Sequence, residues 1–234
     1  MDNLHSIVKT IKHLELKNIT VPLDVKIAAQ RAMKQAGGYD GVRATYWAAI
    51  YDAVYDYLNS VNASVTAFRN GMKKAMVEAF TPAAESGYES GGGTLPMDED
   101  TNEWLTSRQS AELGFIDVLF NDLKALKKQG DFDITSVTFA KANGYAATLD
   151  TIYSGAKLRG AGNKMLTWRF GDTVQHCDTC SSLDGTRHRA AWFTSRNYIP
   201  GGVGSSLDCG GFNCDCSLED DNGEVFAYRG QVIS

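Results

Sequence analysis

Two cysteine-containing stretches, HCDTC at residues 176–180 and LDCGGFNCDC at residues 207–216, decide how the last quarter of this chain folds. The chain has 234 residues and five cysteines, and all five lie between Cys177 and Cys216. Such clustering after a long cysteine-free region marks a module with a chemistry of its own. The fold of this module is therefore expected to depend on its thiol groups.

The spacing of these cysteines predicts a metal site. In the first stretch, two residues separate the cysteines, which lets both thiolates and nearby backbone N–H groups face one ion. A tetrahedral site needs two more ligands, and the second stretch offers three, with Gly210 and Gly211 to let the backbone bend tightly. We predict one structural zinc ion held by four of five cysteines: Cys177, Cys180, Cys209, Cys214 and Cys216.

Other fates for these thiols are open at this point. One disulfide could join the two stretches, or the thiols could be buried and free. Redox catalysis is disfavoured because no strand-helix thioredoxin pattern surrounds the first pair. Cys214 and Cys216 alternate along the chain, so on an extended backbone one would ligate while the other packs elsewhere. His176 and His188 are further candidate ligands.

The region before this module is predicted to be helical, because its apolar residues recur at spacings of three and four. Helices are expected over residues 3–17, 22–36, 42–80, 98–129 and 136–158. Gly71 is a candidate interruption, and Gly130 a candidate cap. The stretch GYESGGG at residues 87–93, which follows Pro82, is predicted to be a flexible loop.

After Asn163 the sequence becomes rich in short runs typical of strands. MLTWRF at residues 165–170 and EVFAYR at residues 224–229 predict strands, and GTRHRAAWF at residues 185–193 predicts a strand or a short helix. Asp184 begins a tight Asp-Gly turn. The fold class is therefore mainly α. An elongated helical bundle over residues 1–162 is followed by a small α+β, metal-stapled C-terminal lobe over residues 163–234.

Composition excludes several classes of function. The net charge of −5 argues against broad binding to nucleic acid and against a basic membrane-surface protein. No apolar run approaches the roughly 18 residues that span a bilayer, and the charged N-terminal stretch favours an amphipathic helix over a secretory signal. The sequence contains no HExxH, GxSxG or Walker motif. We therefore expect no enzymatic activity.

Landmarks around the cysteines resemble a known family. WRFGD at residues 168–172, HCDTC, LDG at residues 183–185, PGG at residues 200–202 and LDCGGFNCDCSL at residues 207–218 are similar to the C-terminal signature of phage Mu F-like head morphogenesis proteins, a group of minor capsid proteins. Many members carry His-Pro-x-Cys-x-Cys in the closing half, and here Cys209 stands roughly where that histidine would be. The resemblance covers about residues 165–220.

This resemblance implies a structural role in the virion. The expected partners are the phage portal, the major capsid protein, or both, with no membrane and no specific nucleic acid. The expected location is the virion, and the host cytoplasm during assembly. Self-association is left open.

Two other functions remain open. The cysteines together with His176 and His188 also fit a metal-dependent nuclease or hydrolase fused to a helical domain. The second alternative is a bacterial adaptor that binds another protein through its helices. The basic run Arg187, His188 and Arg189 fits either a partner-binding site or a solvated surface.

Overall fold

The computed structural model describes residues 22–32, 37–171, 176–201, 205–211 and 214–228. Its long helices are α2 (Leu23–Ala32), α3 (Gly38–Asn59), α4 (Val65–Gly91), α5 (Glu99–Gln129) and α6 (Ile134–Ala161). The smaller elements that follow are β1 (Met165–Arg169), α7 (Asp178–Leu183), β2 (Arg187–Arg189), α8 (Ala190–Ser195), β3 (Ser217–Glu219) and β4 (Val225–Tyr228). The predicted class, a mainly helical bundle followed by a small α+β region, is confirmed. The predicted helix over residues 3–17 lies outside the described residues.

Contacts divide the chain into two compact units. The first comprises Met1–Ala79 and Gln109–Ala146, with Ser234, and the second comprises Phe80–Arg108 and Ala147–Ile233. The division into domains at residues 162 and 163 stays a prediction about which parts fold independently. No helix within the described residues is long and apolar enough to cross a membrane.

In the first unit, α3 supplies the core. Trp47 is fully buried, and its indole N–H donates to the Asn143 side-chain oxygen of α6 at 2.8 Å. The end of α3 is held by Lys127 of α5, whose ammonium group donates to the backbone carbonyls of Tyr57, at 2.7 Å, and of Ser60. The same ammonium lies 5.0 Å from the centroid of the Tyr57 ring. A cation thus satisfies carbonyls that the helix end leaves free.

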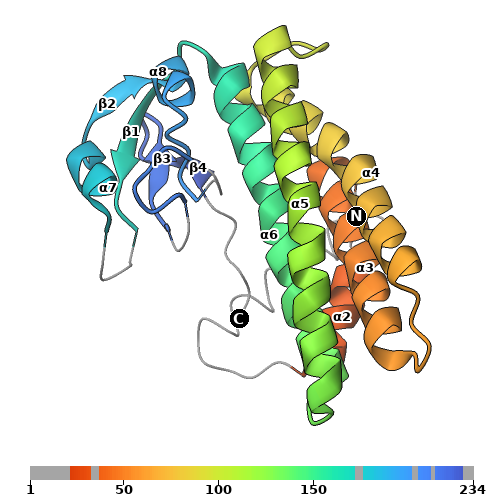
Figure 1. Cartoon of the computed structure of the whole chain (residues 1–234). Coiled ribbons are helices and arrows are strands. Elements are labelled where there is room, and N and C mark those ends of the chain that lie inside the picture. Colours follow the sequence, from red (N-terminus) through yellow and green to blue (C-terminus); the bar gives the residue numbers. More distant parts are fainter. Residues whose placement is uncertain (1–21, 33–36, 172–175, 202–204, 212–213, 229–234) are drawn as a thin grey trace. The chain divides into compact units, whose positions relative to one another are not determined.

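The helix predicted over residues 42–80 is two helices, which run side by side in opposite directions (Figure 1). The break lies at residues 60–64 and not at Gly71. Ser64 marks the restart, because its hydroxyl oxygen accepts from the Ala67 N–H at 3.2 Å. Gly71 instead faces α3, where a Cβ added to it would lie 3.5 Å from the Ala53 methyl group.

The predicted loop at residues 87–93 is wrong for most of its length. In the second unit, α4 continues through Pro82 to Gly91. The cost of an internal proline is about 3 kcal/mol. Burial on the same helix opposes that cost, because Ala83, Ala84 and Tyr88 lose nearly all their solvent exposure.

The glycines of this stretch serve helix packing. A Cβ added at Gly91 would overlap the backbone carbonyl oxygen of Lys157 in α6, and one added at Gly160 would overlap that of Tyr88. Helices approach this closely only where no side chain intervenes. These glycines, which in the sequence suggest a loop, therefore form the contact surface between α4 and α6 in this unit.

Two predicted helix ends are confirmed. The side chain of Asp98 caps α5, since its carboxylate accepts from the Thr101 N–H at 2.8 Å and from the Tyr88 hydroxyl at 3.0 Å. Gly130 ends α5 with a φ of 77° and donates its N–H to the Leu126 carbonyl at 3.3 Å.

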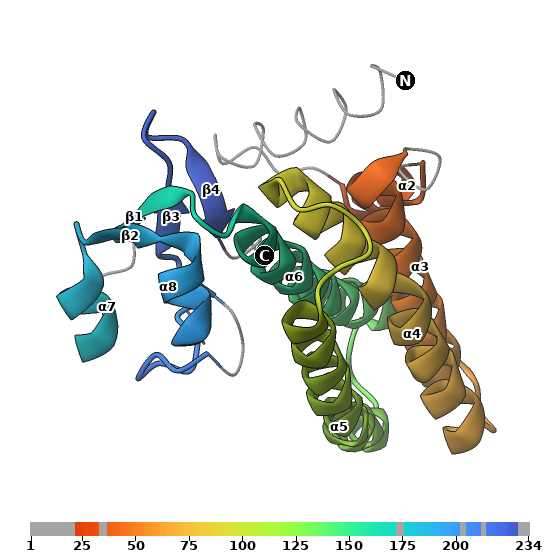
Figure 2. The ribbon, with the colours of Figure 1, turned by 90° about the horizontal axis from the view of Figure 1, so that it is seen from above.

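The C-terminal lobe contains an antiparallel sheet in the order β2-β1-β3-β4. Both predicted strands form, as β1 and β4. The stretch at residues 185–193 supplies both a strand and a short helix, β2 and α8. Gly185, with a φ of 73°, makes the predicted turn between α7 and β2. Figure 2 shows α7 and α8 on one side of the strands, and β1 and β3 form the centre of the sheet.

Candidate metal centre

Three short segments of the lobe carry the cysteines. Cys177 is the N-cap of α7, and Cys180 lies in its first turn. Cys209 sits in a turn, and Cys214 and Cys216 lie on the segment that leads into β3. Because β3 pairs with β1, and the β1–β2 connection includes α7, the sheet brings these distant segments together.

The five cysteine sulfurs lie close enough to hold a metal ion. The sulfurs of Cys177, Cys180 and Cys209 all lie within 4.8 Å of one another, as do those of Cys180, Cys214 and Cys216. Cys180 therefore belongs to both groups, and its sulfur is 3.9 Å from that of Cys214. All five are free thiols, so the sulfurs are gathered without a disulfide.

The expected opposition of Cys214 and Cys216 is wrong. Both sulfurs reach the same group, and both residues are buried. Residues 214–216 precede β3 and are not part of a strand. Alternation of side chains holds for regular strands and fails here, because the segment has not yet entered the sheet.

Backbone N–H groups point at the sulfurs. The N–H of Cys180 donates to the Cys177 sulfur at 3.4 Å, and the N–H of Gly211 donates to Cys209. Gly210 and Gly211 have φ values of 58° and 80°, a left-handed backbone that glycine adopts without strain. The predicted tight bend is therefore present, and it aims a donor at a thiolate position. Hydrogen bonds of this kind favour the ionised form that binds metal.

Asp208 joins the two cysteine segments, a role that sequence reasoning missed. One of its carboxylate oxygens accepts from the Thr179 N–H at 2.8 Å and from the Thr179 hydroxyl at 2.6 Å. These hydrogen bonds from Thr179 lower the pKa of Asp208. The only sequence signal is position, because Thr179 lies inside the first cysteine pair and Asp208 directly precedes Cys209.

Burial and the neighbouring thiols change the pKa values of these cysteines. Burial raises the pKa of Cys180, with further contributions from its neighbours Cys177 and Cys214. The neighbouring Cys216 thiol raises the pKa of Cys214 most, and burial raises it further. Burial also acts on Cys177, yet hydrogen bonds from Cys180 and Cys209 lower its pKa overall. A bound cation would reverse this balance, because a coordinated thiol is deprotonated outright.

The two candidate histidines have different surroundings. The His176 Nδ1 lies 3.8 Å from the Cys216 sulfur, and its ring stacks on Phe170 with centroids 3.8 Å apart. His188 instead stacks on Trp192, also at 3.8 Å. Within the described part of the chain, neither histidine belongs to a cysteine group. The structure places His176 beside one cysteine, Cys216, and His188 beside Trp192.

The basic run beside His188 is largely engaged by the lobe itself. Arg187 forms an ion pair with Asp221 at 2.6 Å, and Arg189 donates to the Asn163 side chain at 3.2 Å. These contacts lie at the surface, where such pairs contribute little to stability. They do, however, neutralise part of the charge that a basic patch would present.

An apolar shell surrounds the cysteines. The buried cluster of the lobe includes Trp168, Leu183, Phe193 and Leu218, each with at most 5% of its surface exposed, together with three of the cysteines. Trp192 packs against this cluster. Trp168 is therefore part of the apolar core of the lobe, and Trp192 covers its edge. The shell limits access of water to the sulfurs.

The donor set fits zinc. Zinc in structural sites is bound by thiolate and imidazole ligands in tetrahedral geometry, and soft thiolates disfavour calcium and magnesium. Zinc–sulfur bonds of about 2.3 Å place two sulfurs of one tetrahedron about 3.8 Å apart. The Cys180–Cys214 separation of 3.9 Å matches that edge.

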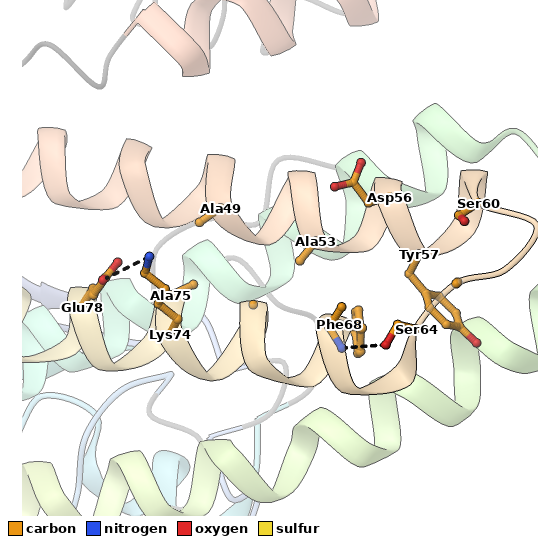
Figure 3. Close-up of a pocket in the computed structure, with 13 residues that line it drawn as sticks. Ala49, Ala53, Asp56, Tyr57, Ser60, Ser64, Phe68, Lys74, Ala75 and Glu78 are labelled. Atoms are coloured by element: carbon orange, nitrogen blue, oxygen red, sulfur yellow. Dashed lines mark hydrogen bonds and ion pairs between the residues drawn. The ribbon is translucent and has the colours of Figure 1, made fainter.

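A second concave feature lies in the first unit. A groove of about 500 Å³ runs between α3 and α4, lined by small residues such as Ala49, Ala53 and Ala75 (Figure 3). Its charged lining residues include Lys74 and Glu78, which pair with each other at 3.8 Å. The groove is lined mainly by methyl groups, and it does not present a converging set of ligand atoms.

Comparisons with models of protein families, with curated proteins and with solved structures found no match for this chain.

Proposed function

We propose that the C-terminal lobe is folded around zinc, and that the chain is a structural protein of a phage head. The gathering of five cysteine sulfurs, three within an apolar cluster and two packed against it, carries the first half of this proposal. A lobe of about 70 residues is small for a hydrophobic core alone, and metal binding adds folding free energy to such a module. The metal acts as a structural ligand and performs no chemistry.

The second half rests on the sequence resemblance to phage Mu F-like head morphogenesis proteins. The residues that carry this resemblance lie in one lobe: Trp168 is in its core, Asp184 and Gly185 form a turn, and Cys177 and Cys216 belong to the sulfur groups. This common location supports treating the motif as one structural module. The portal and the major capsid protein are the partners that the resemblance implies.

Locating the chain in phage particles tests the assembly role. Mass spectrometry of purified procapsids and mature heads, from a phage that encodes this chain, should find it in at least one of them. It should be present in fewer copies than the major capsid protein. Absence from both preparations would contradict the assembly role and leave the metal site untouched.

A nuclease assay tests the enzymatic alternative. The purified chain, incubated with DNA and added magnesium, manganese or zinc, should leave the DNA intact. Cleavage that disappears in the His188→Ala variant would overturn the structural proposal, because it would place His188 in a reaction site.

A further inference from the structure

The five cysteines differ in how far solvent reaches them. Cys180, Cys214 and Cys216 keep only 2%, 6% and 1% of their surface exposed. Cys177 and Cys209 are partly buried and remain in contact with solvent. The susceptibility of a cysteine to oxidation follows its exposure and its thiolate character. A dissolved oxidant therefore meets Cys177 and Cys209 before it meets the other three.

The two accessible cysteines are also neighbours. Their sulfurs lie within 4.8 Å of each other, and the Cys177 sulfur accepts hydrogen bonds from the backbone N–H and the thiol of Cys209. A disulfide bond is about 2.05 Å long, so the two sulfurs must approach by less than about 3 Å to form one. Gly210 and Gly211 follow Cys209 directly, and glycine allows the backbone there to adjust.

We propose that Cys177 and Cys209 are a site of reversible oxidation, at which a hydroperoxide forms a disulfide that releases the metal ion of the lobe. This inference rests on the proposed zinc-binding role of the lobe, and adds the chemical class of reagent that controls it.

The reaction balances with hydrogen peroxide as the oxidant. The sulfur of one cysteine attacks a peroxide oxygen, the O–O bond breaks, and a sulfenic acid and one water form. The sulfur of the second cysteine then attacks the sulfenic sulfur, the S–S bond forms, and the S–O bond breaks to release a second water. The two thiols together lose two electrons and two protons, and the peroxide is reduced to two waters.

The number of cysteines links this bond to the metal. A structural zinc ion takes four ligands, and only three of the cysteines lie outside the pair. Any set of four cysteine sulfurs therefore includes Cys177 or Cys209. Because the thiolate is the form that binds metal, a disulfide between these two leaves at most three sulfur ligands. Oxidation should therefore weaken zinc binding and, with it, the folding of the lobe.

Two other disulfides compete with this one. The sulfurs of Cys180 and Cys214 lie 3.9 Å apart, but both residues are enclosed in the apolar cluster of the lobe. Cys180 also shares a group with Cys177. Access to the oxidant disfavours the first of these pairs, because neither of its members is exposed. In the second pair, only Cys177 is exposed, whereas Cys177 and Cys209 both are.

Mapping of the disulfide in the full chain tests the proposal. The zinc-bound chain is treated with one equivalent of hydrogen peroxide, its remaining thiols are alkylated, and it is digested with a protease that cleaves before aspartate. This cleavage separates four peptides that carry the cysteines: 172–177, 178–183, 208–214 and 215–219. Cys177 and Cys180 therefore fall in different peptides, and Cys209 shares one with Cys214 alone.

Mass spectrometry should find peptide 172–177 joined to peptide 208–214, with Cys214 alkylated and Cys209 cross-linked. A bond from Cys180 to either Cys177 or Cys214 would overturn the proposal. Cysteines that are oxidised singly, without a cross-link, would overturn it as well.

A chromophoric zinc indicator in the same reaction tests the link to the metal. Zinc release should rise in proportion to the cross-linked peptide, and a dithiol reductant should restore binding. A complete disulfide without release would overturn the control of the metal. Absence of zinc before peroxide is added would instead contradict the proposed zinc site, and the disulfide map would still decide whether the pair is oxidised.

Variants provide a matched comparison. Cys209→Ser should release zinc more slowly under peroxide, because a sulfenic acid at Cys177 then lacks its exposed partner. Ser182→Ala, at an exposed position in the same helix as Cys180, should behave as the unchanged chain. Equal release rates in the two variants would contradict the proposal. Zinc content and a circular dichroism spectrum before oxidation show whether Cys209→Ser is folded, and if it is not, the map of the unchanged chain decides.

Discussion

At the scale of single residues, Asp208 links the two halves of the cysteine site without offering a ligand. Its carboxylate receives two hydrogen bonds from Thr179, which lies between Cys177 and Cys180. This contact fixes the positions of the two cysteine segments relative to each other. Groups that orient metal ligands in this way typically contribute 10- to 100-fold to metal affinity.

We predict that Asp208→Ala lowers zinc affinity about 10-fold, by the usual effect of removing such a group. Competition with a chromophoric chelator measures the change. Asp221→Ala is the matched control, because Asp221 is exposed and pairs only at the surface with Arg187. Equal affinities for the two variants would show that the Thr179 contact does not position the ligands.

Asp98 gives a residue-scale prediction that depends on pH. Hydrogen bonds from Thr101 lower the pKa of Asp98 below its ordinary value of 3.8, and the Tyr88 hydroxyl contributes in the same direction. A lowered folded-state pKa means that the ionised cap stabilises the fold above pH 3.8. This contribution is lost as the pH falls through the folded-state pKa.

Asp98→Ala should therefore lower the free energy of unfolding by about 1 kcal/mol at pH 7, as for other helix caps. The difference from the wild-type chain should shrink as the pH falls below 3.8. Urea denaturation of both proteins at several pH values provides the measurement. A difference that stays constant down to pH 3 would rule out the ionised carboxylate as the stabilising group.

At the scale of elements, the sequence predicted the long helices better than their breaks. The apolar spacing within α5 and α6 is local information, so both helices were predicted to within a few residues. Pro82 and the glycines at 87–93 are local signals for a loop, and there the prediction failed. Their role depends on α6, more than sixty residues away, so no local pattern reveals it.

The same reasoning explains what was predictable at the metal site. Cysteine spacing identified all five candidate ligands, because the chemistry of the residues is local information. The convergence of Cys214 and Cys216 on Cys180 was not predictable from alternation along a strand. It depends on where β3 begins, which pairing with β1 decides.

Packing of α4 against α6 gives a prediction for glycine substitutions. Gly91→Ala should destabilise the chain by about 1–3 kcal/mol, the usual cost of forcing a methyl group into a packed contact. Gly114→Ala is the control in an exposed helix interior, where an added Cβ meets nothing within 4 Å. That variant should instead gain about 0.5–1 kcal/mol.

Thermal denaturation of both glycine variants compares these effects. A stabilised Gly91→Ala variant would mean that α4 and α6 do not approach as closely as the structure has them.

The end of α3 gives a second prediction at this scale. Lys127→Met should lower the free energy of unfolding by about 1.5–3 kcal/mol, because hydrogen bonds from a charged donor to the α3 carbonyls are lost. Lys128→Met is the control, since Lys128 is exposed on the next position of α5. Urea denaturation should separate the two variants, and indistinguishable curves would remove Lys127 from its capping role.

At the scale of the whole molecule, two kinds of stabilisation operate in different parts of the chain. The first unit relies on a helical core around α3, with Trp47 and Ile50 fully buried. The C-terminal lobe has short strands and an apolar cluster that contains cysteines. Removing metal is therefore expected to unfold the lobe and to leave the first unit intact.

Hydrogen exchange of the full chain, with and without a zinc chelator, tests this central claim most directly. With zinc bound, the amides that pair β1 with β3 should exchange slowly, and chelation should bring them close to the unfolded rate. The amides of α3 should keep their protection in both states. Slow exchange of β1 and β3 in the metal-free chain would contradict the claim that metal holds the lobe together.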